Sequence, residues 1–378
     1  MAHRGDSFWL CVSVESGAVM RVLLTGGAGY IGTHLLVQLL QDGHDVVVLD
    51  DLSSGSAEAL ARAESVAGRP CRFVLGSIRQ PDKIRQALRG VDVVFHLAAL
   101  KQVSESVQRP GRYFAVNVGG MACLLDGMER QGVRRIVFSS SAAVYGLQAE
   151  MPLCETAELR PASPYGMTKQ VGEQMLAQMA THCGWSAVSL RYFNPVGAHP
   201  SGVLGEPLNK AASLVPRALR ALLYDDQPLT VFGSDYPTSD GTCERDYVHV
   251  CDVARAHLFA LRALERPGHH VYNVGTGRPA SVREVLATCA EVAGRRVPHR
   301  DGARRTGDIP VAVACCDKIT RELGFEARFD LQAMVESAWR WSSASPTALS
   351  EPGLGTGLLA ARRRLASVPG VAGFARSA

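Results

Sequence analysis

Short hydrophobic runs alternate with helical patterns along the first half of this chain. Apolar runs occupy 21–25, 45–50, 72–75, 91–99 and 135–138. Between them, apolar residues recur with helical spacing at 35–40, 81–88 and 116–128. Continuous apolar strands that alternate with helices are typical of a parallel sheet covered on both faces. The pattern predicts an α/β fold, a Rossmann-type doubly wound parallel sheet.

The second half of the chain follows a different pattern. A strand is expected at 185–194, after which Gly, Pro and His become frequent and indicate a domain boundary or a cleft loop. Strands at 229–233 and 271–274 then mix with helices at 214–223, 253–264 and 282–293. We therefore expect a first domain at 20–194 and a smaller mixed α/β substrate domain at 195–345. The ends, 1–19 and 346–378, lack periodicity and are expected to be disordered.

A glycine-rich turn joins the first predicted strand to the first predicted helix. It satisfies G-x-G-x-x-G at Gly27, Gly29 and Gly32, and the second strand ends in Asp50. Such glycines let the backbone approach a pyrophosphate at a helix N-terminus, and the acid about 20 residues on binds a ribose 2′-hydroxyl. Asp50 and Asp51 would repel a 2′-phosphate. The unit 20–194 is therefore predicted to be an NAD-binding domain, with NAD preferred over NADP.

Two side chains further on are spaced for acid–base chemistry. Tyr165 and Lys169 stand four apart, which places them on one face of a helix. A nearby ammonium favours the phenolate and is expected to lower the pKa of the tyrosine. Ser141 ends a predicted strand, where ligands bind in open parallel sheets. Each feature alone is common, on exposed helix faces and in turns, and His96 is expected to be structural.

Composition narrows the choice of partners. The chain has 378 residues, is 47% hydrophobic and carries a net charge of +4, which gives no nucleic-acid footprint. No apolar run approaches the roughly 20 residues of a membrane span. The apolar stretch 8–12 is too short for a signal peptide. Ten cysteines are scattered without C-x-x-C spacing, so we expect reduced, buried thiols, no metal site and a cytoplasmic protein.

Eight sequence blocks resemble a known family. The chain is similar to the extended short-chain dehydrogenase/reductases, and within them to the UDP-glucose (UDP-galactose) 4-epimerases. The resemblance runs from about residue 20 to 341. It rests on TGGAGYIG at 25–32, LAALK at 97–101, FSSSAAVYG at 138–146, SPYGMTK at 163–169, RYFNPVGAHPSG at 191–202, GSDYPTSDGT at 233–242, RDYVHV at 245–250 and RTGD at 305–308.

The resemblance implies two sets of site residues. The cofactor-binding set for NAD is Gly26, Gly29, Tyr30, Ile31, Gly32, Asp50, Asp51, Ser77, Ile78, Leu97, Ala98, Ala99, Lys101, Tyr165, Lys169 and Phe193. The substrate-binding set for a UDP-hexose is Ser141, Tyr165, Asn194, Ser213, Leu214, Val231, Phe232, Arg245, Arg305, Asp308 and Ala312. Within it Arg245 and Arg305 would clamp the diphosphate, to which arginine forks are suited, and Asp308 would bind the uridine ribose.

The resemblance also implies an isomerase mechanism. Tyr165 would remove the proton of the sugar 4-hydroxyl, which Ser141 hydrogen-bonds, while Lys169 acidifies the phenol. Hydride would pass from C4 to tightly bound NAD and return to the other face of a transient 4-keto sugar. Members of this family form homodimers through paired helices of the first domain, and we expect the same here.

Three positions depart from the family pattern. Ser77 stands where an acid usually contacts adenine, and Ala212-Ser213-Leu214 replaces Asn-Asn-Leu at the uridine loop. Ala312 stands where a large tyrosine restricts other members to unsubstituted hexoses. We therefore predict some activity on UDP-GlcNAc and UDP-GalNAc.

The same scaffold also serves other functions. A 4,6-dehydratase typically has an Asp-Glu pair directly after the strand-end hydroxyl, where this chain has Ala142 and Ala143. A decarboxylase would need a uronate pocket, and the sequence leaves that alternative open. A non-catalytic NAD-binding sensor would have no reason to keep Ser141, Tyr165 and Lys169 together.

Overall fold

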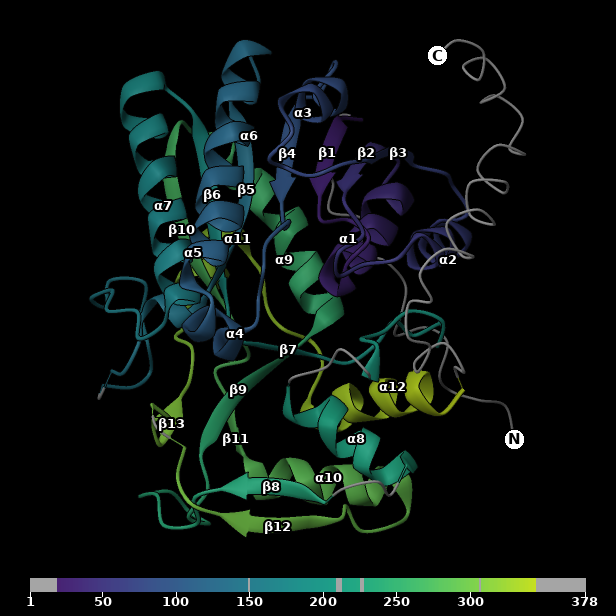
Figure 1. The fold of residues 1–378 in the computed structure, drawn as a ribbon, viewed down its shortest axis with the longest axis vertical. Coiled ribbons are helices and arrows are strands. Elements are labelled where there is room, and N and C mark those ends of the chain that lie inside the picture. Colours follow the sequence, from purple (N-terminus) through teal and green to yellow (C-terminus); the bar gives the residue numbers. More distant parts are fainter. Residues whose placement is uncertain (1–18, 149, 209–212, 225–227, 306, 345–378) are drawn as a thin grey trace.

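A seven-stranded parallel sheet forms the larger part of the protein in this computed structural model, which describes residues 19–148, 150–208, 213–224, 228–305 and 307–344. The strand order is β10-β6-β5-β4-β1-β2-β3 and every neighbouring pair is parallel (Figure 1). The strands are β1 (Arg21–Thr25), β2 (Asp45–Asp50), β3 (Arg72–Leu75), β4 (Val93–His96), β5 (Arg135–Ser141), β6 (Ser186–Tyr192) and β10 (Gly268–Val274). The predicted fold class is confirmed.

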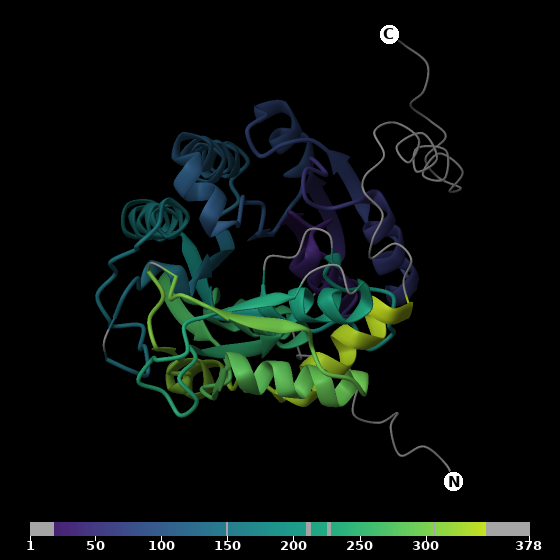
Figure 2. The same cartoon turned by 60° about the horizontal axis from the view of Figure 1, so that its bottom comes forward.

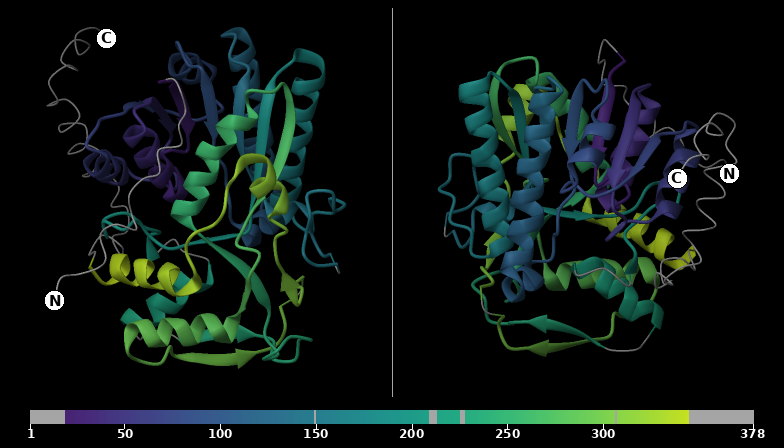
Figure 3. Two further views of the ribbon diagram at one scale, coloured as in Figure 1. Left: turned by 180° about the vertical axis from the view of Figure 1, so that it is seen from behind. Right: turned by 45° about the horizontal axis from the view of Figure 1, so that its top comes forward.

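Helices cover both faces of this sheet. Helices α1 (Tyr30–Gln41), α2 (Ala57–Ala67) and α9 (Val250–Ala263) lie on one face, and α3 (Pro81–Ala87), α6 (Gly119–Arg130) and α7 (Pro164–Cys183) on the other (Figure 3). Successive residues of β1 alternate between the two cores: Val22 and Leu24 pack toward α1 and α9, and Leu23 toward α3 and α6. This two-sided burial explains why the strands read as unbroken apolar runs.

Strand β10 corrects one assignment made from the sequence. The run at 271–274 was expected in the smaller domain, but it pairs with β6 at the edge of the large sheet, with Val271 opposite Ser189. Helix α9, from the same half of the chain, packs beside α1. A pairing between strands so far apart in sequence leaves no local signal, and the composition change after Pro195 does not mark the end of the large sheet.

The helix expected at 116–128 is present, and its first residues belong to a π-helical turn. The chain forms α4 (Val103–Gln108), α5 (Pro110–Tyr113), this π-helical turn at Phe114–Val118 and then α6. Within the π turn, the Asn117 side chain donates to Leu100 O at 3.0 Å and to Thr168 Oγ1 at 3.0 Å, and accepts from Leu100 N at 2.8 Å. These tertiary bonds tie the turn to the segment after β4 and to α7. π turns are often found at functional sites.

Most of the remaining elements form a smaller layer below the carboxyl edge of the large sheet, whereas α11 packs against α9 and β10 of the large sheet (Figures 1 and 2). Strand β9 (Glu244–His249) pairs with β7, β11 and β13, and β8 pairs with β12. Helices α8, α10 and α12 share one hydrophobic core beside these strands. The bounds are β7 (Asn194–Val196), β8 (Leu229–Phe232), β11 (Pro279–Ser281), β12 (His299–Gly302), β13 (Val311–Ala312), α8 (Leu214–Tyr224), α10 (Val282–Ala293), α11 (Asp317–Leu323) and α12 (Leu331–Ala344).

The predictions for the chain ends concern 1–19 and 346–378, which lie outside the described residues except for Val19. Among the helices that the structure describes, none has the length and apolar character needed to span a membrane.

Candidate active site

The glycine turn between β1 and α1 is packed too closely for side chains. A Cβ on Gly26, whose φ is 74°, would lie 2.7 Å from Ala98 N, and one on Gly32 would lie 2.2 Å from Gly26 O. No side chain caps the N-terminus of α1 at Gly29. The first N–H groups of this helix are therefore available for an anionic group. The turn has the close backbone approach and the free donors that a pyrophosphate requires.

Asp50 lies at the end of β2 against this turn. Its Oδ2 accepts from Ala28 N at 3.0 Å and its Oδ1 accepts from Leu52 N at 2.8 Å. Burial raises the pKa of this carboxyl, and the two backbone donors act in the opposite direction. Asp51 is exposed beside it. The predicted ribose-binding acid is thus fixed at the edge of the glycine turn.

Two further cofactor candidates follow β3. The Ile78 side chain is buried against α6, where a Cβ on Gly120 would lie 2.6 Å from Ile78 Cδ1. Ser77 is partly exposed, and its N–H donates to Gln80 Oε1 at 2.9 Å.

The segment after β4 approaches the glycine turn from the other side. Leu97 N donates to Thr25 O at 3.1 Å, and Ala98 N donates to Thr25 Oγ1 at 3.3 Å. Ala99 continues this segment and is partly buried. Beyond it, Lys101 forms an ion pair with Glu206 at 3.0 Å.

Tyr30 and Ile31 open helix α1. The Tyr30 hydroxyl donates to Gly197 O at 2.6 Å, and Lys101 Nζ lies 5.9 Å from the centre of its ring. Burial raises the pKa of Tyr30, with Glu206 adding to the effect. Ile31 packs against the core beside α1. These contacts tie the start of α1 to the segment from Gly197 to Glu206.

Ser141, Tyr165 and Lys169 come together at the carboxyl end of β5. Helix α7 begins with Ser163 as its N-cap, which accepts from Gly166 N at 3.2 Å. The helix start sits close to the turn after Ser141, because a Cβ on Gly166 would lie 2.5 Å from Ala143 O. Lys169 Nζ lies 5.9 Å from the centre of the Tyr165 ring. The close packing brings Ser141 into hydrogen-bond contact with Tyr165.

The pKa of Tyr165 differs from the prediction. Burial raises the pKa of Tyr165, against which the Ser141 hydrogen bond acts. Burial also lowers the pKa of Lys169 to about 7, partly opposed by Glu173. Lys169 donates to Ser139 O at 2.7 Å and is not among the groups that shift the pKa of Tyr165. The expected lowering of the tyrosine pKa is therefore absent from the protein by itself, because both groups lose water.

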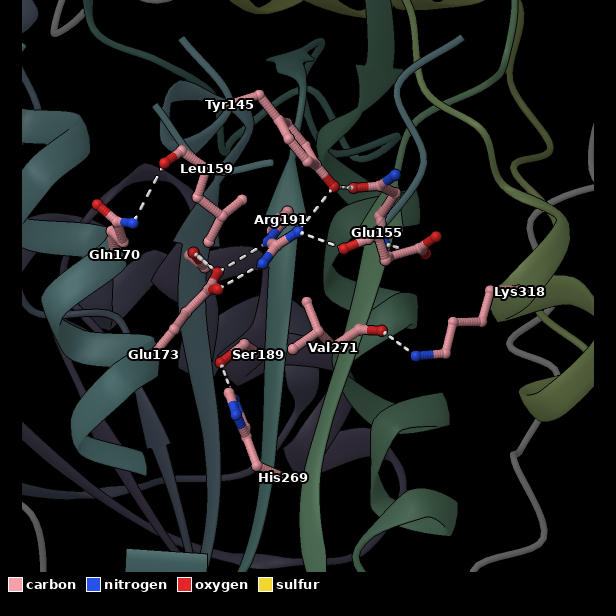
Figure 4. A network of polar contacts seen from close by, with 12 residues as sticks. Tyr145, Glu155, Leu159, Gln170, Glu173, Ser189, Arg191, His269, Val271 and Lys318 are labelled. Atoms are coloured by element: carbon pink, nitrogen blue, oxygen red, sulfur yellow. Dashed lines mark hydrogen bonds and ion pairs between the residues drawn. The ribbon is translucent and has the colours of Figure 1, made fainter. Parts of the chain in front are cut away.

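A buried polar network around Glu173 and Arg191 was not predicted from the sequence (Figure 4). Glu173, one turn after Lys169, accepts from Arg191 Nε at 2.9 Å and Nη2 at 2.6 Å, and from Ser140 Oγ at 2.5 Å. Arg191 Nη1 also donates to Tyr145 Oη at 2.9 Å. An arginine inside an apolar strand and an acid four residues after Lys169 were the available signals.

His96 is buried at the end of β4. Its Nδ1 lies 2.8 Å from Thr25 Oγ1, and its ring stacks on Phe138. Burial lowers the pKa of His96 to about 3, with Lys169 adding to the effect. These contacts favour the structural role expected for it.

Three charged candidates meet in the smaller layer. Asp308 accepts from Arg305 Nε at 3.1 Å and Nη2 at 2.9 Å, and lies 3.6 Å from Arg245 Nη2. Arg245 also donates to Ile309 O at 2.9 Å, and the Arg305 guanidinium lies 5.6 Å from the centre of the Phe232 ring. The carboxylate of Asp308 therefore lies against the guanidinium groups of both Arg245 and Arg305.

The other substrate candidates are distributed around this cluster. Ala312 is partly exposed on β13, directly opposite Arg245 in the strand register. Asn194 Nδ2 donates to Asp246 O at 2.7 Å. Phe193 is buried beside Val144 and Tyr145, near the turn after Ser141.

The uridine-loop candidates Ser213 and Leu214 lie at the start of α8. Ser213 donates to Glu206 Oε2 at 3.3 Å, and Leu214 begins the helix. Val231 is buried in the core of the smaller layer, so its side chain does not face an open edge. Ala212 lies outside the described residues.

Comparisons with known proteins agree with this geometry. Residues 22–275 match the model of the NAD dependent epimerase/dehydratase family. The UDP-glucose 4-epimerase of Bacillus subtilis is 44% identical over 331 residues, which cover 86% of this chain and 98% of that protein. The fold also matches a UDP-glucose-4-epimerase from Stenotrophomonas maltophila, solved with bound NAD and formylated UDP-arabinopyranose, at a TM-score of 0.82 and 44% identity over 86% of this chain and 98% of that one.

A third relative is the UDP-Glc/GlcNAc 4-epimerase of Campylobacter jejuni, whose structure matches with a TM-score of 0.76 and 33% identity over 86% of this chain and 100% of that chain. The chain therefore belongs to the NAD-dependent epimerase/dehydratase family, in the group of the UDP-glucose 4-epimerases.

Proposed function

We propose that this protein interconverts UDP-galactose and UDP-glucose by inverting the sugar carbon C4. The observation that carries the proposal is the meeting of Ser141, Tyr165 and Lys169 at the sheet edge that also holds the glycine turn. A dinucleotide-binding protein without catalysis would need the turn but not this group. The similarity to UDP-glucose 4-epimerases along most of the chain supports the same reaction.

The residues around the glycine turn fit NAD. Close packing at Gly26 and Gly32, the uncapped start of α1 and the carboxylate of Asp50 match the needs of a pyrophosphate and a ribose. We assign the adjoining cofactor set named from the sequence to the same dinucleotide. When bound, NAD supplies the oxidation and the reduction at the sugar C4.

The protein's own part of the reaction is proton transfer and positioning. Tyr165 takes the proton of the 4-hydroxyl and returns one after the sugar has turned, and Ser141 hydrogen-bonds the same oxygen. Lys169 contributes a positive charge, and because burial lowers its pKa to about 7, its ammonium group readily loses a proton. Its bond to Ser139 O keeps that charge beside the reacting group.

Arg245, Arg305 and Asn194 are assigned to the substrate diphosphate, and Asp308 to the uridine ribose. Arg305 is well exposed and its guanidinium can leave Asp308 for phosphate oxygens, which suit its fork geometry. We assign Ser213, Leu214, Val231 and Phe232 to the uridine side of the pocket, Val231 as part of its supporting core.

N-acetylated substrates are a second proposal, carried by Ala312. A methyl group at this position leaves room that a tyrosine would fill, and the residue lies opposite Arg245. The Campylobacter jejuni relative is described as a UDP-Glc/GlcNAc 4-epimerase. We infer that this chain also turns over UDP-GlcNAc and UDP-GalNAc.

We further propose the division into an NAD-binding domain at 20–194 and a substrate domain at 195–345, with α9 and β10 returning to the first sheet.

A homodimer is proposed through helices of the first domain. Val103, Val107 and Phe114 expose apolar surface there, and Val107 is 62% exposed. Sedimentation at micromolar concentration tests the dimer. The cytoplasmic location stays a prediction from the sequence.

The decisive experiment for the function follows the sugar by NMR. Purified protein with UDP-galactose and no added NAD should form UDP-glucose, and the same assay with UDP-GlcNAc should form UDP-GalNAc. Protein that carries NAD but converts neither pair would favour the sensor alternative. Carbon dioxide released from a UDP-uronate would instead favour a decarboxylase.

A further inference from the structure

Two cysteines far apart in the sequence lie side by side at the edge of the sugar site. Leu153 and Ala314 form a parallel bridge, in which Leu153 N donates to Val313 O at 2.9 Å and Cys315 N donates to Leu153 O at 2.9 Å. Cys154 and Cys315 are the next residue on each segment. Neighbouring strands run about 4.8 Å apart, within the Cα separation of about 4.4–6.8 Å that a disulfide spans.

A third segment fixes this arrangement. The Asn273 side chain donates from Nδ2 to Leu153 O at 2.8 Å and to Cys315 O at 3.2 Å. The two backbones are thus held by hydrogen bonds on either side of the cysteine pair. The Cys154 thiol donates to Pro152 O at 3.8 Å and lies near enough to the Cys315 thiol for the two to interact, and both residues are partly exposed. An oxidant can therefore reach both sulfur atoms.

We propose that Cys154 and Cys315 form a reversible disulfide, a modification site at the border of the sugar pocket. Cys154 lies in the segment between Ser141 and Tyr165, and Cys315 comes three residues after Ala312, which lies opposite Arg245. The bond joins the segment between the acid–base residues to the segment that follows the position assigned to substrate size. The position of the bond beside a sugar pocket, but not its formation, rests on the proposed function.

The oxidation balances with a low-molecular-weight disulfide as oxidant. A thiolate of the pair attacks the oxidant, whose S–S bond breaks and releases one small thiol. The second cysteine then attacks the mixed disulfide and releases the other small thiol, so two electrons and two protons leave the protein. The protein gains one S–S bond and loses two S–H bonds.

The surroundings of Cys154 set the pH at which this happens. The neighbouring Cys315 thiol and burial raise the pKa of Cys154 to about 11, and the carboxylates of Glu155 and Asp317 add to the effect. Little of the Cys154 thiol is therefore ionised at neutral pH, and the thiolate is the attacking form. Attack by Cys154 should be slow at pH 7 and about tenfold faster for each pH unit up to pH 9.

The test is oxidation of the whole purified protein with oxidised glutathione, followed by non-reducing digestion and mass spectrometry. We expect a peptide crosslinked between Cys154 and Cys315, reversed by dithiothreitol. The variants Cys154→Ser and Cys315→Ser should lack it, and the neighbouring Cys316→Ser should keep it. Circular dichroism of each variant shows whether it is folded, and the crosslink should raise the melting temperature by several degrees.

Three outcomes would overturn the proposal. Glutathione adducts without the crosslink would show that the two sulfur atoms do not meet. Pairing of either cysteine with Cys316, or a crosslink that forms only in denaturant, would show that the folded chain does not present this pair. A crosslink that lowers the melting temperature would show that the native backbone must distort to accept it.

Discussion

Lys169 donates a hydrogen bond from Nζ to the carbonyl oxygen of Ser139 at 2.7 Å. The bond holds the side chain under the end of β5, 4.9 Å from the centre of the Phe138 ring and 5.9 Å from that of Tyr165. Removal from water lowers the pKa of Lys169 to about 7. A lysine with this pKa can lose its proton near neutral pH, and its position next to a buried tyrosine favours proton transfer there.

The hydroxyl of Tyr165 is expected to carry the proton transfer. Tyr165→Phe removes it without changing the packing of the ring, and general acid–base catalysis contributes roughly 10²–10⁴-fold. The turnover of UDP-galactose should fall by about that factor, while the NAD content and the melting temperature stay unchanged. The exposed Tyr224→Phe is the matched control and should keep wild-type activity. A Tyr165→Phe enzyme with more than about a tenth of the activity would contradict the assignment, given that range.

The charge of Lys169 should appear in the pH dependence of stability. Its pKa falls from 10.5 to about 7 on folding. Between these values the unfolded chain binds a proton that the folded chain lacks, so raising the pH favours the folded state. From pH 7 to 10 the free energy of unfolding of cofactor-stripped wild type should rise by about 3–4 kcal/mol relative to Lys169→Met. Denaturant titrations measure this difference, and a flat difference across the range would refute the shift.

The pair of Glu173 and Arg191 is expected to stabilise the site strongly. Both side chains are about 5% exposed, and removing one member of a buried ion pair typically costs about 3–5 kcal/mol. Glu173→Gln should lose that much in urea unfolding. Asp82→Asn breaks the exposed pair with Arg85, whose side chains are 84% and 64% exposed, and should cost less than about 1 kcal/mol. Equal losses of unfolding free energy in the two variants would show that the buried pair stabilises the protein no more than the exposed pair does.

The residue at position 312 should determine substrate size. Ala312→Tyr is expected to lower the rate on UDP-GlcNAc relative to UDP-galactose by about tenfold or more, because the ring fills space that an N-acetyl group needs. The plain hexose should react at close to its original rate. Competition between the two substrates in one NMR tube measures the ratio directly. An unchanged ratio would mean that another residue sets the size of the pocket.

Local features of the fold could be predicted because they are determined by residues that are close together in the sequence. The glycine turn from Gly26 to Gly32, Asp50 at the strand end and the spacing of Tyr165 and Lys169 each depend on a few consecutive positions. The structure places them as expected, at one edge of a parallel sheet. The prediction of β4 was longer than the strand, which ends at His96.

Features that depend on distant partners could not be predicted. The pairing of β10 with β6, the ion pair of Glu173 with Arg191 and the hydrogen bond of Asn117 with Thr168 all join segments that are separate in sequence. The pKa of Tyr165 was predicted in the wrong direction because burial, which the sequence pattern does not report, raises this pKa and also lowers the pKa of Lys169. The proximity of Cys154 and Cys315 also appears only in the fold, where scattered and buried thiols were expected; Cys243, Cys251 and Cys289 are buried, and the other described cysteines are partly exposed.

The central claim is that Tyr165 works on a sugar beside a dinucleotide that the protein never releases during turnover. Its most direct test is to denature the freshly purified enzyme, quantify the released dinucleotide by mass spectrometry, and assay the same preparation on UDP-galactose without added NAD. We predict equimolar NAD and full conversion to the equilibrium mixture with UDP-glucose. Protein that releases no dinucleotide and stays inactive after incubation with NAD would contradict the account.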